Sequence, residues 1–142
     1  MDNTLVDEFG SKERPGIRAL LDRLTRDGHT LLLWTNSTRM RALDILKYNE
    51  LRKYFATCIF REDYDPANSG IMKDIRRVKG DILIDDDPAE IAYVRSIGCA
   101  GFLIPSYRKG KPVNAQDVEE LSRWLEERRR KRGVRRRKGG WR

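Results

Sequence analysis

Short apolar runs alternate with amphipathic segments along this chain, and this alternation limits the folds that it can adopt. The apolar runs have the length of strands rather than helices and are flanked by turn residues, which is typical of buried strands. We expect strands within 29–35, 57–60, 81–87 and 100–105. Strands that alternate with helices predict an α/β domain, in which helices cover both faces of a parallel sheet.

The segments between these strands have helical spacing. In the first, apolar residues recur between Pro15 and Gly28, which suit a helix start and a helix end. In the last, Asn114 suits an N-cap. We expect helices within 15–28, 37–55, 69–80 and 88–98 and from residue 114 onward. No strand precedes Asp2, although a doubly wound sheet normally opens with one, so the first strand is missing from the printed sequence.

Basic residues are concentrated at one end of the chain. Of the 30 Lys and Arg residues, ten lie in 128–142, which has no Asp or Glu. Residues 1–127 hold the other 20 and all 22 acidic residues, a net charge of −2 against +8 for the whole chain. We therefore expect a core domain at 1–127 and a flexible basic tail at 128–142. Such a tail is often an arm for nucleic acid, and a tail that only aids solubility is the alternative.

Composition also excludes several classes of protein. No apolar run approaches the length of about eighteen residues that a membrane span needs, so no membrane partner is expected. The N-terminus lacks the pattern of a secretory signal. The two cysteines, Cys58 and Cys99, are too few for a disulfide framework and lack the spacing of metal ligands. Free thiols fit a reducing compartment, and we expect a cytoplasmic location.

Polar residues follow the expected strands at their carboxyl ends, where open α/β sheets place their ligand sites. Asp85 and Asp86 follow a buried strand, and their repulsion would be relieved by a hard cation such as Mg²⁺. Thr35 and Asn36 follow another strand, and Lys73 lies on the short helix before the acidic one. A hydroxyl, backbone amides and an ammonium group suit phosphate oxygens. This inventory favours phosphoryl transfer.

Four motifs in this order resemble those of the haloacid dehalogenase superfamily, which consists mostly of Mg²⁺-dependent phosphatases with a Rossmann-like, three-layer α/β/α core. They are "MDNTLV" with Asp2 and Thr4, "LLLWTNS" with Thr35, "IMKDIRRV" with Lys73, and "ILIDDDP" with Asp85 and Asp86. The resemblance covers roughly residues 1 to 105. The stretch from Lys73 to Glu90 is also similar to the matching region of the small C-terminal-domain phosphatases.

The chain departs from the superfamily at one decisive position. The nucleophile of these enzymes is an aspartate that would fall one residue before Met1, on a central strand, and neither is in the printed sequence. Three explanations for this departure compete. Met1 is an internal methionine of a longer chain, which we favour. Otherwise the chain is a shortened, inactive form, or a partner chain fills the gap in the sheet. Loss of a central strand would leave its two neighbours with unpaired backbone groups.

The resemblance implies a mechanism if the nucleophile is supplied. Asp2 would be the general acid and base, and Thr35, Asn36 and Lys73 would bind the phosphoryl group. Mg²⁺ would be held by the nucleophile, by Asp2 through its carbonyl, and by Asp85 or Asp86. We therefore expect Asp2, Thr35, Lys73 and Asp85 to be catalytic.

The gaps between the motifs are too short for a cap domain. A capless site is open and suits macromolecular phosphorylated substrates, which include phosphoproteins and nucleic-acid ends. The alternative to a phosphatase is an inactive domain of the same fold that binds nucleic acid or a protein through residues 128–142. Asp87 is expected to cap the following helix, and Asp63 and Asp65 to be solvated.

Overall fold

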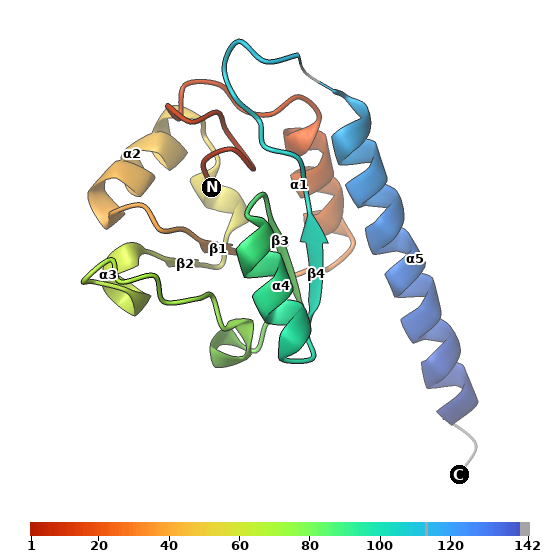
Figure 1. Ribbon diagram of the computed structural model, residues 1–142. Helices are drawn as coiled ribbons and strands as arrows, with labels where there is room; N and C mark the ends of the chain where they lie inside the picture. The colour runs from red at the N-terminus through yellow and green to blue at the C-terminus, as the bar shows by residue number, and fades with distance from the viewer. Residues whose placement is uncertain (113, 140–142) are drawn as a thin grey trace.

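The computed structural model describes residues 1–112 and 114–139 and has the expected α/β composition (Figure 1). The strands are β1 (Leu32–Trp34), β2 (Thr57–Ile59), β3 (Ile82–Asp85) and β4 (Ala100–Leu103), each inside an expected range. The helices are α1 (Ile17–Arg26), α2 (Arg39–Tyr48), α3 (Arg61–Tyr64), α4 (Pro88–Ser96) and α5 (Gln116–Gly139), with single 3₁₀ turns η1 (Arg52–Tyr54) and η2 (Ile75–Val78). None of the described helices is both long and apolar enough to cross a membrane.

The strands form two separate parallel pairs rather than one continuous sheet. β1 pairs with β2, and β3 pairs with β4, each in register along its length. No ladder joins β1 to β3 in the described chain. The expectation of a parallel sheet is confirmed for each pair.

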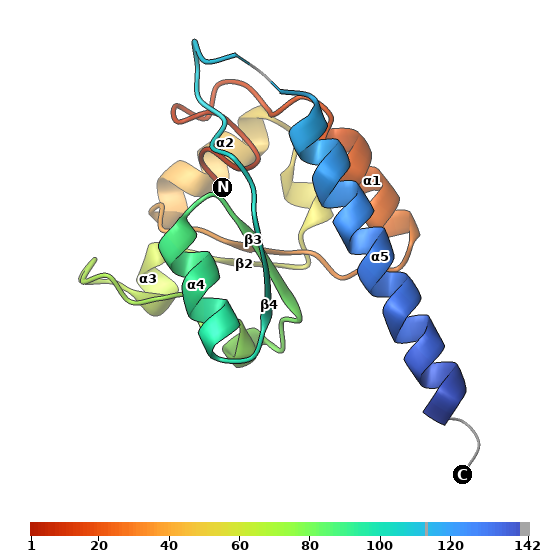
Figure 2. The same cartoon turned by 45° about the vertical axis from the view of Figure 1, so that its right-hand side comes forward.

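Helices cover both faces of the β3–β4 pair, as a three-layer fold requires (Figure 2). On β3, Ile82 and Ile84 pack against the larger core, which includes apolar residues of α1 and α5, while Leu83 packs with Ile91 and Val94 of α4. Alternate residues of a strand point to opposite faces, so this short strand contributes to two cores. Helix α4 packs closely on β4 at Gly101. A Cβ added at this glycine would lie only 2.9 Å from the Val94 side chain, so a larger residue would not fit without a shift.

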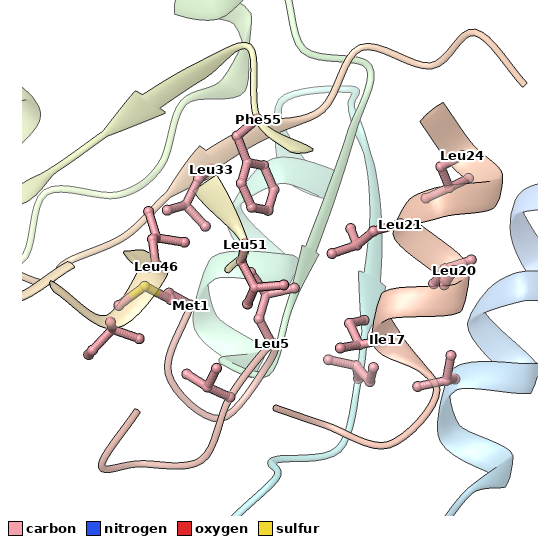
Figure 3. Close-up of a cluster of buried hydrophobic side chains, with 14 of the residues drawn as sticks. Met1, Leu5, Ile17, Leu20, Leu21, Leu24, Leu33, Leu46, Leu51 and Phe55 are labelled. Carbon is pink, nitrogen blue, oxygen red and sulfur yellow. The ribbon is translucent and has the colours of Figure 1, made fainter. Parts of the chain in front are cut away.

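The N-terminal segment packs into the larger core. Met1 and Leu5 are 8% exposed and lie among leucines of α1, α2 and the following turn, with Leu33 of β1 nearby (Figure 3). The Met1 carbonyl accepts hydrogen bonds from the backbone N–H groups of Thr4, Leu5 and Val6. The segment is therefore a tight turn, whose backbone groups are satisfied locally.

Three segments differ from expectation. The range 69–80 was expected to be a helix but contains only the 3₁₀ turn η2. The Asp74 side chain caps the start of η2, and Lys79, in a left-handed conformation with φ 55°, ends it. The polar loop after β2 begins with the helical turn α3. Asp65 in this loop is 1% exposed and accepts hydrogen bonds from the backbone N–H groups of Ser69, Gly70 and Ile71, so the expectation that it is solvated was wrong.

Helix α5 extends through most of the segment expected to be a flexible tail. Asn114 accepts a hydrogen bond from the Gln116 N–H before the helix, as the capping pattern predicts. The helix continues from Gln116 to Gly139, and residues 140–142 of the expected tail lie outside the described part of the chain. The flexibility of residues 128–142 stays a prediction.

Candidate active site

A buried ion pair lies at the carboxyl end of β3. Lys73 Nζ donates a hydrogen bond to Asp85 Oδ2 over 2.7 Å, and the two residues are 8% and 6% exposed. The other Asp85 oxygen accepts from the Asp87 backbone N–H at 3.0 Å. Burial opposes ionisation of Asp85, but the charge and hydrogen bond of Lys73 outweigh it and lower the pKa of the carboxyl. Asp85 is therefore held as a carboxylate beside an ammonium group.

Glu90 of α4 holds the backbone of Lys73 in position. Its carboxylate accepts a hydrogen bond of 2.9 Å from the Lys73 backbone N–H. Burial raises the pKa of Glu90, and the nearby charges of Asp85 and Asp87 act in the same direction. Sequence reasoning missed this residue, because a glutamate in the first turn of a helix ordinarily indicates only a favourable interaction with the helix dipole.

The α-amino group of Met1 is buried among the predicted site residues. Burial and the charge of Lys73 lower the pKa of this amino group to about 6, although the charges of Asp85, Asp2 and Asp86 act to raise it. The charges of these four side chains therefore all act on the Met1 α-amino group.

Asp86 links three segments of the chain. One of its oxygens accepts from the Thr4 hydroxyl at 3.1 Å, and the other accepts from the Ser106 hydroxyl at 2.7 Å. Thr4 lies in the N-terminal turn and Ser106 follows β4. Asp87, in contrast, caps α4 by accepting from the Ala89 N–H at 2.9 Å, which confirms the capping expectation.

Asp2 lies on the side of the site that faces α2. Arg41 Nη1 donates to one Asp2 oxygen at 2.8 Å and Nη2 donates to the other at 3.2 Å, and the Ser37 hydroxyl lies 3.4 Å from the first. Sequence reasoning missed Ser37 and Arg41. No pattern in the sequence indicated this pair, because Ser37 lies in the turn before α2 and Arg41 lies in the first turn of the helix.

Thr35 and Asn36 follow β1 but have different surroundings. Thr35 is 3% exposed, and its hydroxyl accepts from the Ser37 N–H at 3.0 Å, which places it next to the partner of Asp2. Asn36 is exposed, and its side-chain amide donates to Asn68 at 3.3 Å on the rim. The structure therefore brings Asp2, Thr35, Lys73, Asp85 and Asp86 to the strand ends, while the Asn36 side chain turns to the loop.

A buried arginine holds the N-terminal turn in place. Arg14 is 4% exposed and donates to the carbonyls of Asn3 and Thr4, each at 2.7 Å, and to that of Pro105. It also lies 3.7 Å from an oxygen of Asp117 at the start of α5. Asn3 has a φ of 63°, a left-handed conformation that asparagine tolerates better than most residues. Arg14 thus fixes the turn that carries Asp2.

The predicted metal ligands only partly fit a magnesium site. Asp85 and Asp86 supply hard oxygen donors of the kind that Mg²⁺ prefers. Within 1–112 and 114–139, however, no group of three or more His, Cys, Asp or Glu side chains is arranged to hold a metal. The Asp2 carboxylate faces Arg41 instead, so only its backbone carbonyl remains as a donor. Asp85, Asp86 and the Asp2 carbonyl therefore do not by themselves complete a magnesium site within the described residues.

Comparison with protein families identifies this arrangement. Residues 2–135 match the family described as NLI interacting factor-like phosphatase. The chain belongs to this family. The match spans nearly all of the chain and confirms the resemblance to haloacid dehalogenase-type phosphatases that the four motifs indicated. A search of curated proteins found no match.

Two solved structures have a similar fold. A hydrolase from Streptococcus pneumoniae TIGR4 is 19% identical, with a TM-score of 0.55, over 80% of this phosphatase-family chain and 60% of its own. A protein assigned as a beta-phosphoglucomutase from Thermotoga maritima is 18% identical, with a TM-score of 0.56, over 79% of this chain and 55% of its own. The chain thus spans little more than half the length of these proteins, and at this identity the similarity concerns the fold alone.

Proposed function

We propose that this domain is a Mg²⁺-dependent phosphoric monoester hydrolase that acts through an aspartyl-phosphate, with the nucleophilic aspartate at the position before Met1. The observation that carries the proposal is the buried pair of Lys73 and Asp85 at the end of β3, next to Asp86, whose carboxylate accepts a hydrogen bond from Thr4 in the turn that carries Asp2. The family assignment supports the same reaction class.

The chain's own residues have separate roles in the proposed reaction. The aspartate oxygen attacks phosphorus and the ester P–O bond breaks, while Asp2 donates a proton to the departing oxygen. Asp2 then takes a proton from water, whose oxygen attacks phosphorus and releases the aspartate and inorganic phosphate. Lys73 neutralises phosphoryl charge, and Thr35 with the Asn36 N–H holds its oxygens. Arg41 and Ser37 orient Asp2.

Bound Mg²⁺ would be held by Asp85, Asp86, the Asp2 carbonyl and the nucleophile, and it would neutralise charge that develops on the phosphoryl group. Lys73 holds the buried Asp85 as a carboxylate, and this contact would have to release an Asp85 oxygen for a cation to bind there. The pairing of Thr4 and Ser106 with Asp86 fixes the orientation of the second carboxylate.

An open entrance favours a macromolecular substrate. Only α1 separates the N-terminal turn from β1, and short elements separate Thr35 from Lys73, so the described chain has no cap over the site. A shallow groove between the N-terminal loop and α2 adjoins Arg41 and includes the exposed side chains of Phe9 and Met40. We propose that a phosphorylated macromolecule reaches the site from this side. A cytoplasmic location stays a prediction.

The alternative is a catalytically inactive domain of the same fold. In this alternative, the basic residues of 128–142 would bind nucleic acid or a protein partner. Such a domain would act through binding alone.

Hydrolysis of a generic aryl phosphate with Mg²⁺ separates these two functions. We would compare the chain as printed with a version that carries a short apolar segment ending in Asp before Met1. The proposal expects turnover only in the extended version, and its loss in the extended Asp2→Asn variant. No turnover in either version would favour the inactive domain, and turnover by the printed chain would overturn the assigned nucleophile.

A further inference from the structure

The second half of α5 carries a strongly basic surface that the phosphatase mechanism does not use. We define the basic segment as residues 128–135, which hold six Lys and Arg residues and no acidic or aromatic residue. The first half of the helix is anchored by the buried side chains of Val118, Leu121 and Leu125. The second half extends past the body of the molecule (Figures 1 and 2).

Two contacts at the base of the segment set its direction. Arg129 lies 3.4 Å from an oxygen of Asp27, just after α1, and Arg132 lies 3.4 Å from an oxygen of Asp81, just before β3. Arg128 also stacks over the Trp124 ring at 5.0 Å. The segment therefore leaves the body at the amino end of β3, whereas the candidate active site lies at the carboxyl end.

The remaining basic side chains point to solvent. Arg130, Lys131 and Arg135 are exposed, and none of them forms an ion pair with an acidic residue in the described part of the chain. Consecutive residues of a helix are about 100° apart, so Arg130 lies on a different side from Lys131 and Arg135. These three charges thus cover the sides of the helix that Asp27 and Asp81 do not neutralise.

We propose that the basic segment of α5 binds the phosphate backbone of double-stranded nucleic acid. An α-helix with its side chains is about 10–12 Å wide, which matches the width of a DNA major groove of about 12 Å. Charges on several sides of one helix can reach phosphates on both walls of such a groove.

The position of the segment also determines what this binding can do. A duplex held beyond the amino end of β3 lies away from Lys73, Asp85 and the groove beside Arg41. The bound duplex therefore tethers the domain and is not itself delivered to the active site. The inference stands independently of the proposed hydrolysis, because binding needs no turnover.

Fluorescence anisotropy with a labelled DNA duplex of arbitrary sequence tests the inference directly. We would compare the full chain with the Arg130→Gln, Lys131→Gln, Arg135→Gln variant at several salt concentrations. Glutamine is a good helix former, so α5 is expected to persist, which circular dichroism checks. Log affinity decreases linearly with log salt, and the variant should make this line less steep. The magnitude of the slope should decrease by about 0.9 for each phosphate that the variant no longer neutralises, which is about 2.7 for three phosphates.

A matched control removes the same charge elsewhere. Lys47, Arg108 and Lys111 are exposed on the body, and their joint replacement by glutamine should leave the salt slope within about 0.5 of the original. Equal decreases in both triple variants would overturn the inference, because net charge alone would then explain binding. Tighter binding to the matching single strand, or binding to polyglutamate without binding to the duplex, would also overturn it.

Discussion

The buried pair of Lys73 and Asp85 is the residue-scale feature on which the site depends. Each charge is removed from water and is stabilised mainly by the other. A buried pair of this kind adds little net stability, but the loss of one partner leaves an uncompensated charge. Both residues were predicted from the sequence, whereas their contact was not, because sequence spacing does not indicate which side chains meet across a loop.

Replacement of Lys73 by methionine should destabilise the domain strongly. The variant leaves Asp85 ionised and buried without its ammonium partner, which costs about 3–5 kcal/mol of unfolding free energy. Urea denaturation measures this change. The double variant Lys73→Met, Asp85→Asn should recover most of the loss, and the exposed Lys111→Met should change stability by no more than about 0.5 kcal/mol. A Lys73 variant as stable as the parent would contradict the role of the pair.

The same pair predicts a pH dependence of stability. Because Lys73 lowers the pKa of folded Asp85 below its value of about 3.9 in an unfolded chain, the unfolded state binds more protons between the two values. The contribution is present above about pH 3.9 and is lost as the pH falls through the folded pKa. Urea midpoints of the parent and of Asp85→Asn should therefore differ at pH 7 and converge as the pH falls below about 4. A difference that stays constant would contradict the assignment.

At the scale of elements, the strands and helices that have a repeated spacing of apolar residues could be predicted from the sequence. Features that depend on single contacts in the folded chain could not. The apolar runs that became β1 to β4 and the periodic segments that became α1, α2 and α4 were located correctly. The turn α3 and the buried Asp65 were missed, because Asp65 satisfies backbone N–H groups that only the folded loop brings together. The length of α5 was missed because a run of like charges ordinarily indicates a mobile tail.

A single substitution tests whether the basic segment is helical. A Cβ added at Gly133 meets nothing within 4 Å, so Gly133→Ala should favour the helix by about 1 kcal/mol without a clash. Amide hydrogen exchange should then slow by about fivefold in the surrounding turns. Gly133→Pro should accelerate exchange in the same turns. Unchanged exchange in both variants would indicate that this part of the chain is not helical.

At the scale of the whole molecule, the two strand pairs and the N-terminal turn bring the predicted site residues to one end of the fold. Asp2, Thr35, Lys73 and Asp85 come from segments far apart in sequence, and the fold brings them to the ends of β1 and β3. The order of the motifs was enough to predict this gathering. It did not reveal Arg14, whose buried guanidinium joins the N-terminal turn, the loop after β4 and the start of α5.

The most direct test of the central claim is to detect the aspartyl-phosphate itself. A version with an apolar segment ending in Asp before Met1 would be mixed with an aryl phosphate and Mg²⁺, quenched in acid and weighed by intact-mass spectrometry. The account predicts a mass increase of one phosphoryl group, located on that Asp by peptide mapping and absent when the residue is Asn. Turnover without any adduct, or an adduct on another residue, would contradict it.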